Sequence, residues 1–325
     1  MTRVLVLGGT AWLGARIAAG WAASGAEVFC LARGESGAAP EGCTLVRADR
    51  HDPSSYDGLV GEWDEVVELS YEPEFVGPAL AALAPRAAHW TLVSTVSVYA
   101  GIDRPGADES AALVRPRDLT QYPDAKVAAE VTTAEHVGDR LLLARPGLIV
   151  GPGDTSDRFG YWTARLSRGG AALAPVTAGR HVQVIDVDDL AGWLVAAGAR
   201  GLVGTVNAVG PSITMDEFFA EAMVVSGHAD GLVMADDDEL RSQGVNHWAG
   251  PRSLPLWVPR DLNVINQLSR QAFVEAGGMT RPLQATLQRT LADELARGID
   301  RERRSGLTAA EEAAASAAIL EARAG

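Results

Sequence analysis

Residues 4–14 read Val4-Leu5-Val6-Leu7-Gly8-Gly9-Thr10-Ala11-Trp12-Leu13-Gly14, and this stretch decides the fold. The apolar run before the glycines predicts a buried strand, and the run that begins at Ala15 predicts a helix. A glycine turn between them would bring backbone N–H groups and the positive end of a helix dipole to one point. The spacing G-x-x-A-x-x-G is typical of a turn that binds a dinucleotide pyrophosphate, although a purely structural turn can share it.

Strand-like and helix-like runs alternate through the first half of the chain. The predicted strands are Arg3–Leu7, Glu27–Leu31, Thr44–Val46, Glu65–Leu69, Trp90–Ser94 and Leu141–Arg145. The predicted helices are Leu13–Ser24, Ser54–Val60, Phe75–Ala84 and Asp118–His136. Continuous apolar strands joined by helices indicate a parallel sheet covered on both faces. With right-handed crossovers, this is an α/β fold with a doubly wound Rossmann sheet.

The pattern changes after Gly151-Pro152, where shorter elements and polar loops begin. Two capping-box sequences predict later helix starts, at Thr214–Glu217 and Thr308–Glu311. We expect a smaller C-terminal substrate-binding lobe beside the sheet. The expected division is a dinucleotide-binding domain of residues 1–150 plus about 184–210, and a substrate-binding lobe of 151–183 plus 211–325.

Composition narrows the class of partner. The formal net charge of −14 argues against nucleic acid, whose affinity for proteins comes largely from Lys and Arg. The two cysteines, Cys30 and Cys43, show no metal-binding or redox spacing, so we expect core thiols and no metal. No apolar run approaches about 20 residues, so no membrane span is expected. The chain enters its first strand without a leader-like segment, which favours a cytoplasmic location.

Two polar segments supply the candidate catalytic groups. The strand at Trp90–Ser94 runs into the hydroxyl-rich sequence Ser94–Tyr99, and the carboxyl end of a parallel strand is where such sheets bind ligands. Tyr122 and Lys126 follow, four residues apart and therefore on one helix face. A phenol, with a pKa of about 10, becomes a usable acid or base when a nearby ammonium favours the phenolate. Tyr122 would then exchange a proton with a substrate oxygen that Thr95 orients.

At this point the chain resembles the extended short-chain dehydrogenase/reductase family, which includes NAD-dependent epimerases and dehydratases. The resemblance covers about residues 3 to 210. It includes the glycine turn, the tyrosine–lysine pair and the segments Asp49–Asp52 and Arg145–Pro152. It implies that Thr95, Tyr122 and Lys126 are the catalytic residues.

The resemblance also implies a set of cofactor contacts. Asp49 would face the adenine with Arg50 beside it, Leu69 and Ser70 would lie near the adenosine ribose, and Pro146 and Gly147 near the nicotinamide. The expected cofactor-binding residues are Gly8, Thr10, Ala11, Trp12, Leu13, Gly14, Arg33, Asp49, Arg50, Leu69, Ser70, Tyr122, Lys126, Pro146 and Gly147. The resemblance further implies a homodimer through the helices at 75–84 and 118–136.

The end of the second strand indicates which cofactor is used. An acidic residue there would hold a ribose 2′-hydroxyl, but the chain has Ala32 at this position and Arg33 after it. A guanidinium can grip a 2′-phosphate, so we predict NADP(H) rather than NAD. Glu35 could still take the ribose, which keeps NAD open as the alternative.

Departures from the family pattern bear on the reaction. Val96 and Ser97 stand where dehydratases carry an acidic pair, so a dehydratase is disfavoured. Leu148 and Val182 stand where sugar-nucleotide epimerases usually contact the diphosphate, with Arg180 and His181 as nearby substitutes. The favoured function is an NADP(H)-dependent oxidoreductase acting on a small carbonyl or alcohol. The alternatives are an NAD-dependent sugar-nucleotide epimerase that recycles its hydride, and a dinucleotide-sensing or RNA-binding relative with reduced catalysis.

The substrate is expected between the carboxyl edge of the sheet and the smaller lobe. The expected lining residues are Tyr71, Val96, Ser97, Leu148, Trp162 and Trp257. Apolar and aromatic walls favour a small molecule of hydrophobic or mixed character as the substrate.

Overall fold

The computed structural model describes residues 1–325, except for the side chains of Pro53 and Asp261. The chain forms two compact units. Unit 1 comprises Met1–Ile149, Val187–Gly210 and Leu268–Thr280, and unit 2 comprises Val150–Asp186, Pro211–Gln267 and Arg281–Gly325.

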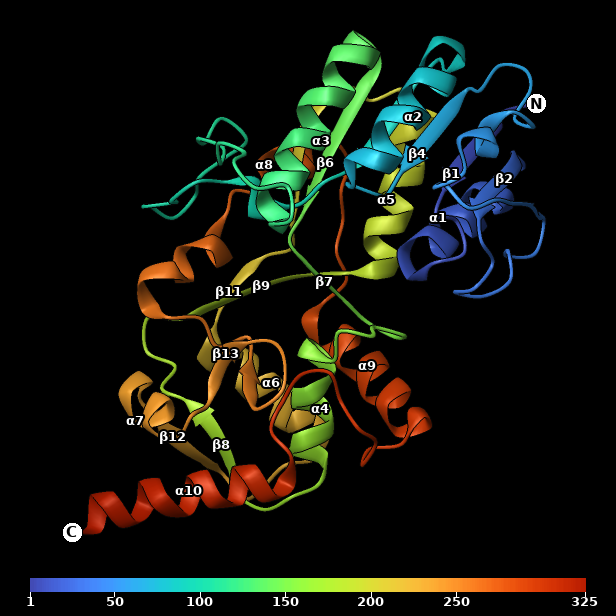
Figure 1. The fold of residues 1–325 in the computed structure, drawn as a ribbon. Helices are drawn as coiled ribbons and strands as arrows, with labels where there is room; N and C mark the ends of the chain where they lie inside the picture. Colours follow the sequence, from blue (N-terminus) through green and yellow to red (C-terminus); the bar gives the residue numbers. More distant parts are fainter. The chain divides into compact units, whose positions relative to one another are not determined.

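Unit 1 is built on a seven-stranded parallel sheet (Figure 1), in the order β10-β6-β5-β4-β1-β2-β3. The strands are β1 (Arg3–Leu7), β2 (Glu27–Ala32), β3 (Cys43–Arg47), β4 (Glu65–Glu68), β5 (Trp90–Val93), β6 (Leu141–Pro146) and β10 (Gly204–Ala208). The order reverses between β1 and β4, which is the arrangement of a doubly wound nucleotide-binding sheet. The predicted α/β Rossmann architecture is therefore confirmed.

Two pairs of helices cover this sheet. α1 (Trp12–Ala23) packs against α5 (Val187–Ala199), and α2 (Pro73–Leu83) packs against α3 (Tyr122–Val137). Right-handed crossovers place the two pairs on opposite faces. The interior under α2 and α3 includes Leu5, Trp63, Val76, Trp90 and Leu92, all at most 2% exposed. This apolar core holds the carboxyl ends of the strands in fixed positions.

Two predicted helices differ from the structure. The run predicted at Ser54–Val60 forms only the short 3₁₀ helix η1 (Pro53–Tyr56), because Gly58 and Gly61 follow it closely and disfavour a longer helix. The helix predicted from Asp118 begins at Tyr122. The Asp118 carboxylate instead accepts hydrogen bonds from the backbone and hydroxyl of Thr120, which stabilises a turn.

Unit 2 joins short strands to a helical layer. Its helices are α4 (Arg158–Ser167), α6 (Met215–Ser226), α7 (Asp237–Ser242), α9 (Leu283–Arg297) and α10 (Ala309–Ala324). Its strands are β8 (Ala172–Pro175), β9 (His181–Asp186), β11 (Ser212–Thr214), β12 (Leu232–Ala235), β13 (Asn246–Trp248) and β14 (Ser253–Pro255). Helices α4, α6 and α9 pack on one another. Both predicted capping boxes are present, at Thr214 and Thr308.

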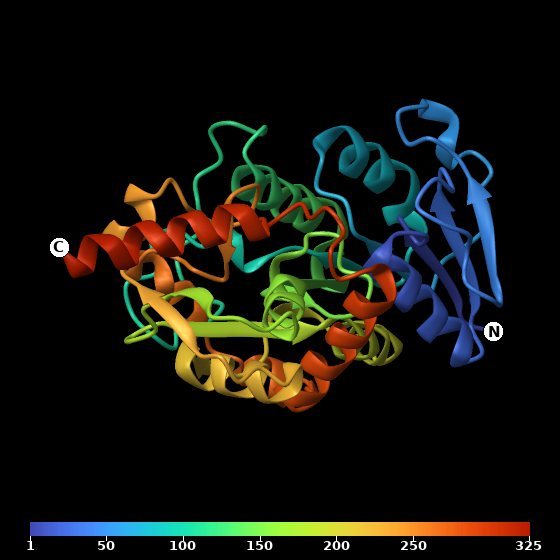
Figure 2. The same ribbon diagram turned by 90° about the horizontal axis from the view of Figure 1, so that it is seen from below.

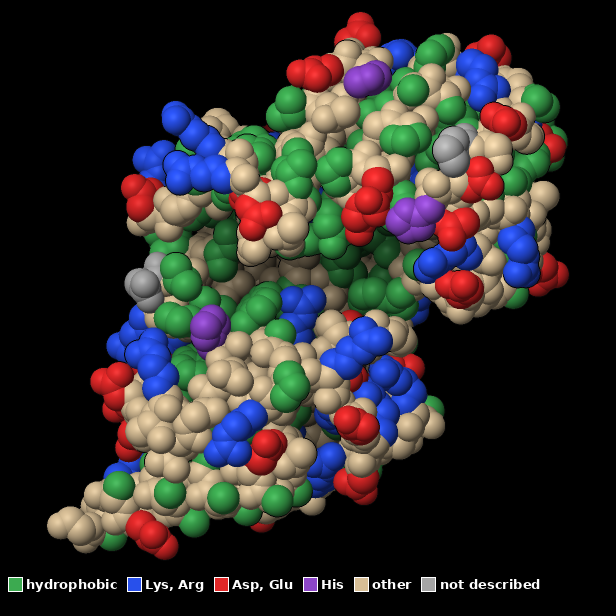
Figure 3. Space-filling model, viewed as in Figure 1, with side chains coloured by type: hydrophobic (Ala, Val, Ile, Leu, Met, Phe, Trp, Pro, Cys, Tyr) green, Lys and Arg blue, Asp and Glu red, His purple; other side chains and the backbone are tan. Residues whose placement is uncertain are grey.

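The remaining elements are short. They are β7 (Leu148–Val150), α8 (Gln271–Glu275) and the 3₁₀ segments η2 (Ala84–Arg86), η3 (Val96–Val98), η4 (Gly138–Arg140) and η5 (Arg260–Gln267). α10 is a single straight helix that ends at the C-terminus (Figure 2). Separate hydrophobic side chains are visible on its surface (Figure 3). Leu320 of this helix is 49% exposed. Among the described residues, no helix is long and apolar enough to cross a membrane.

The division into units departs from the expected domain bounds at one segment. Residues 268–280 belong to unit 1 rather than to the C-terminal lobe. Three hydrogen bonds explain this assignment: Ser269 N donates to Ala107 O, and the Trp193 indole and the Arg200 guanidinium both donate to Ala276 O.

Candidate active site

The glycine turn joins β1 to α1 in a conformation that only small residues permit. Gly8 has φ = +92°, a conformation that L side chains rarely adopt. Its N–H donates to Leu31 O at 2.9 Å, and Ala11 N donates back to Gly8 O at 3.1 Å. A Cβ at Gly14 would strike Gly8 O, and one at Gly9 would lie 2.5 Å from Cys30 Sγ. The turn is therefore packed against the sheet and fixed in shape.

The amino end of α1 has no capping side chain and no acidic first-turn residue of its own. Ala11 occupies the cap position without a side-chain cap, and the first turn contains no acidic residue. The positive end of the helix dipole is thus uncompensated by the helix itself, as an anion site requires. Thr10 and Leu13 are buried beside the turn, and Trp12 is partly exposed. Leu69 lies against the turn: a Cβ added at Gly8 would lie 3.7 Å from Leu69 Cδ1.

A cavity of about 600 Å³ lies at the ends of β2 and β3. Its polar lining includes Arg33, Glu35, Arg47 and Asp49. Arg33 and Glu35 form an exposed ion pair at 3.1 Å. The Arg47 guanidinium reaches over Gly34, where its Nη2 would lie 3.2 Å from an added Cβ. The sequence pattern did not single out Arg47, because it lies fourteen residues after Arg33 and meets the cavity only through β2–β3 pairing.

Arg50 lies beside this cavity but is already fully engaged. Its guanidinium makes a bidentate ion pair with buried Glu68, at 2.9 and 2.6 Å. Its other N–H groups donate to the Tyr56 hydroxyl, Ser70 Oγ and Phe75 O, so all five donors are used. Burial opposes the charge of Arg50, but Glu68 outweighs it and raises the Arg50 pKa. These contacts favour a structural role for Arg50, and its predicted cofactor contact stays a prediction.

The hydroxyl cluster lies where the sequence places it, just beyond β5. Thr95 is 7% exposed and caps η3. Its Oγ1 accepts from Ser97 N at 3.1 Å and donates to Ser97 Oγ at 3.3 Å. Val96 is buried, and among the described residues Ser94 Oγ is a buried hydroxyl with no partner. This edge of the sheet therefore keeps one buried hydroxyl, that of Ser94, which the described residues do not satisfy.

Tyr122 is the first residue of α3, and Lys126 lies one turn further along. Tyr122 is 43% exposed, whereas Lys126 is 4% exposed and donates to Val93 O at 2.8 Å. Lys126 is the only lysine of the chain. Burial lowers the Lys126 pKa to about 8, against the opposing pull of the carboxylates of Glu68, Glu72 and Glu130. A proton on this amine is therefore held weakly enough to respond to what binds beside it.

A further predicted residue, Tyr71, joins this pair. Its ring centroid lies 5.1 Å from that of Tyr122, with the two rings nearly perpendicular at 88°. The Lys126 ammonium lies 4.9 Å from the Tyr71 centroid and 5.9 Å from the Tyr122 centroid. Three of the predicted site residues, from two separate segments, are therefore in direct contact.

A buried polar network joins α3 to β6. Glu130, one turn after Lys126, forms a bidentate ion pair with Arg145 on β6, at 2.9 and 2.6 Å. Arg145 also donates to the Tyr99 hydroxyl at 3.0 Å, and Tyr99 donates to Asn207 Oδ1 at 2.6 Å. Sequence reasoning missed this network, because its members lie far apart in the chain. It fixes β6 directly before the predicted nicotinamide contacts, Pro146 and Gly147.

The predicted lining residues of unit 2 are enclosed within that unit. Trp162 donates its indole N–H to Pro255 O at 2.7 Å, and Trp257 donates to Asp237 at 2.9 Å. Both indoles are 1% exposed. Arg180 is also 1% exposed and donates to Val176 O, Val258 O and Asp237. Leu148, a predicted lining residue of unit 1 at the start of β7, is 9% exposed. A substrate contact by any of these side chains stays a prediction.

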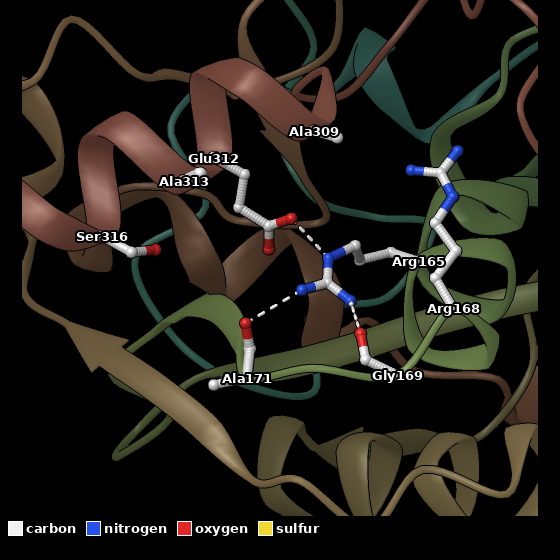
Figure 4. Close-up of a pocket in the computed structure, with 8 residues that line it drawn as sticks. All are labelled: Arg165, Arg168, Gly169, Ala171, Ala309, Glu312, Ala313 and Ser316. Atoms are coloured by element: carbon white, nitrogen blue, oxygen red, sulfur yellow. Dashed lines mark hydrogen bonds and ion pairs between the residues drawn. The ribbon is translucent and has the colours of Figure 1, made fainter.

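A second cavity, of about 240 Å³, lies in unit 2 between the end of α4 and the start of α10 (Figure 4). Arg165 projects from α4 and pairs with Glu312 of α10. Arg165 also donates to Gly169 O and Ala171 O at 2.9 Å, and Glu312 accepts from Leu173 N at 2.8 Å. These charges satisfy each other and the neighbouring backbone groups. The ion pair beside the cavity therefore attaches α10 to α4 and has a structural role.

Comparison with known proteins adds information about the fold. No protein-family model and no curated protein matches the sequence. Among solved structures, the chain is similar to one described as a candidate epimerase from Burkholderia cenocepacia J2315. The two share 21% identity with a TM-score of 0.70, over 91% of this chain and 98% of that one. A UDP-glucose 4-epimerase from Thermotoga maritima, solved with UDP-glucose, shares 16% identity with a TM-score of 0.66, over 91% and 99%.

A third similar structure is UDP-glucuronic acid 4-epimerase from Bacillus cereus in complex with NAD. It shares 13% identity with a TM-score of 0.66, over 91% of this chain and 99% of that one. The chain shares its fold with these three structures. The fold that the resemblance to the extended short-chain dehydrogenase/reductase family implies is thus confirmed.

Proposed function

We propose that the chain is an NADP(H)-dependent oxidoreductase that transfers a hydride between the nicotinamide and a small carbonyl or alcohol. The observation that carries this proposal is the contact of Tyr71, Tyr122 and Lys126 at the start of α3. An accessible phenol, Tyr122, lies one helical turn from Lys126, the buried and only lysine of the chain. This is the arrangement that general acid–base chemistry by a phenol requires.

The residues of unit 1 fit a dinucleotide. The uncapped amino end of α1 and the glycine turn suit a pyrophosphate, and the cavity with Arg33 and Arg47 suits an adenosine 2′-phosphate. Arg33 is paired with Glu35, so its grip on a phosphate would be weakened but not abolished. A bound nicotinamide would supply or accept the hydride.

The protein side chains would handle the proton and the substrate oxygen. In the reductive direction Tyr122 would give its phenolic proton to the carbonyl oxygen as that oxygen gains negative charge. Thr95 would donate a hydrogen bond to the same oxygen and would then lose the hydrogen bond that it donates to Ser97 Oγ. Lys126 would stabilise the resulting phenolate and hold a ribose hydroxyl with the ammonium donors that Val93 O leaves unused.

A sugar-nucleotide epimerase is the second candidate, and the likeness to a structure solved with UDP-glucose favours it. Two observations count against it. Arg180, one of two residues that could replace the usual diphosphate contact, is buried and bonded to Asp237 and to backbone carbonyls. Leu148 offers no polar group where such enzymes usually have an amide. The homodimer and the cytoplasmic location stay predictions.

One experiment separates the two candidates. The purified protein is denatured and any released dinucleotide is identified by mass, and the native protein is then titrated with NADPH and NADH. A reductase should release little cofactor, prefer NADPH, and lose about five- to tenfold in NADPH affinity in Arg33→Ala. Stoichiometric released NAD and equal or better NADH binding would contradict the NADP(H) proposal and favour the epimerase.

The catalytic assignment is tested by Tyr122→Phe in a screen of carbonyl substrates. Turnover should fall by about 10²–10⁴-fold while NADPH binding is kept, because only the acid–base group is lost. Tyr161→Phe, which removes a buried phenol from unit 2, is the matched control and should leave turnover unchanged. Full activity of Tyr122→Phe would reject this mechanism.

A further inference from the structure

Lys126 has few polar contacts for a buried cation. Among the described residues, its ammonium has one hydrogen-bond acceptor, Val93 O at 2.8 Å, although it carries three N–H donors. The surrounding carboxylates of Glu68, Glu72 and Glu130 act on it through their charge, but none is hydrogen-bonded to it. Glu68 and Glu130 are instead committed to Arg50 and Arg145.

The Tyr71 ring provides the contact that the carboxylates do not. Its centroid lies 4.9 Å from Lys126 Nζ, within the range of a cation–π interaction. Such a contact is strongest where water is excluded, and Lys126 is 4% exposed. The ring therefore favours the ammonium form at a position where burial disfavours it.

The same ring also contacts the proposed proton donor. Tyr122 begins α3 and is 43% exposed, so its ring needs a packing contact if it is to keep one orientation. The rings of Tyr71 and Tyr122 meet edge to face, at 5.1 Å and 88°, which is a favoured aromatic geometry. Tyr71 thus packs against both members of the tyrosine–lysine pair.

The backbone that carries Tyr71 is held in place by the buried ion pair beneath it. Ser70 N donates to Glu68 Oε1 at 2.8 Å, and Arg50 holds both the Glu68 carboxylate and Ser70 Oγ. Tyr71 N donates to Glu72 Oε2 at 3.1 Å. These contacts give a physical reason for burying Glu68 at the end of β4, where it is 0% exposed.

We propose that Tyr71 is a positioning residue of this site, whose ring holds the Lys126 ammonium by a cation–π contact and orients the Tyr122 phenol by an edge contact. The inference rests on the proposed function, in which Tyr122 and Lys126 act on the substrate. The ring rather than the hydroxyl carries the effect, so phenylalanine should replace Tyr71 and an aliphatic residue should not.

The single lysine allows a direct test that needs neither cofactor nor substrate. Protein labelled with ¹³C at lysine Cε gives one side-chain signal, from Lys126, whose pKa is read by a pH titration. Tyr71→Phe should titrate like the wild type. Tyr71→Leu should lower the Lys126 pKa by roughly 0.5 to 1, as expected for loss of a buried cation–π contact. Tyr71→Met is a second ring-free variant in case the leucine variant fails to fold.

Turnover of the carbonyl substrate gives the second readout. Tyr71→Leu should lower kcat about five- to tenfold with a smaller change in KM, and Tyr71→Phe should stay within about twofold of the wild type. A leucine variant with the wild-type Lys126 titration, or a phenylalanine variant as impaired as leucine, would overturn the proposal. The expected titration shift in a protein that reduces no carbonyl would reject the proposed function and still support the Tyr71 contact.

Discussion

Two buried cations, Arg165 of unit 2 and Lys126 of unit 1, have different numbers of hydrogen-bond partners. In unit 2, Arg165 binds a carboxylate and three backbone carbonyls where α4 meets α10. In unit 1, Lys126 is as deeply buried but has one carbonyl and aromatic rings as partners. A fold normally satisfies the polar groups that it buries. The difference favours a stabilising role for Arg165, and it supports the proposal that Lys126 acts on a ligand.

The largest effect that would test this difference is on activity. Lys126→Met should reduce turnover by about 10²–10⁴-fold, because the phenol of Tyr122 loses its neighbouring cation. The thermal unfolding midpoint should stay level or rise, since an incompletely satisfied buried charge is removed. Calorimetry and steady-state kinetics measure the two effects. A variant that is both active and strongly destabilised would make Lys126 structural and break the comparison.

The next effect is on the stability of unit 2. Arg165→Met should lower the free energy of unfolding by about 3–5 kcal/mol, because Glu312 stays buried without its cation. Adding Glu312→Leu should recover most of this loss, since both charges are then absent. Denaturant unfolding of the single and double variants measures both changes. An unaltered single variant would show that α10 does not depend on this ion pair.

A smaller effect concerns an ion pair within unit 1. Buried His89 contacts Glu65 and, through Nε2, Leu202 O at 2.8 Å. Burial disfavours its charge, but the hydrogen bond and the charge of Glu65 outweigh burial and raise the His89 pKa.

The raised pKa fixes the sign of the pH dependence. The pair's stabilisation should be complete below the unfolded-state pKa of about 6.5 and lost as pH rises through the folded value. The stability advantage of the wild type over His89→Gln should thus shrink between acidic and alkaline pH. His136→Gln, at an exposed histidine, is the control. If the stability advantage of the wild type over His89→Gln were constant across this pH range, His89 and Glu65 would not form a charged pair.

The smallest expected effects concern the exposed charges of the cavity at the ends of β2 and β3. Arg47→Ala should weaken NADPH binding about two- to fivefold and leave NADH binding unchanged, because exposed charge pairs contribute little. Glu35→Gln should strengthen NADPH binding by a similar factor, since it releases Arg33. Fluorescence titrations with both cofactors measure these changes. Equal changes for NADPH and NADH would exclude a 2′-phosphate contact.

Local sequence rules predicted the elements whose cause is local. β1 was predicted at its observed bounds, and the capping boxes at Thr214 and Thr308 formed because each needs only four consecutive residues. The extent of α3 was predicted too long, because the Asp118 side chain stabilises a turn that competes with helix.

The sequence by itself determined the positions of the first six strands of the sheet, the glycine turn and the shared helix face of Tyr122 and Lys126, since each depends on short-range periodicity and backbone sterics. Only the tertiary structure decided which charged side chains are bonded to other groups of the protein. The commitment of Arg50 to Glu68, the enclosure of Arg180 and the contact of Tyr71 with Lys126 depend on residues from separate segments that meet through the fold. No regular spacing in the sequence reveals such contacts, because burial and strand pairing, rather than distance along the chain, determine which residues meet.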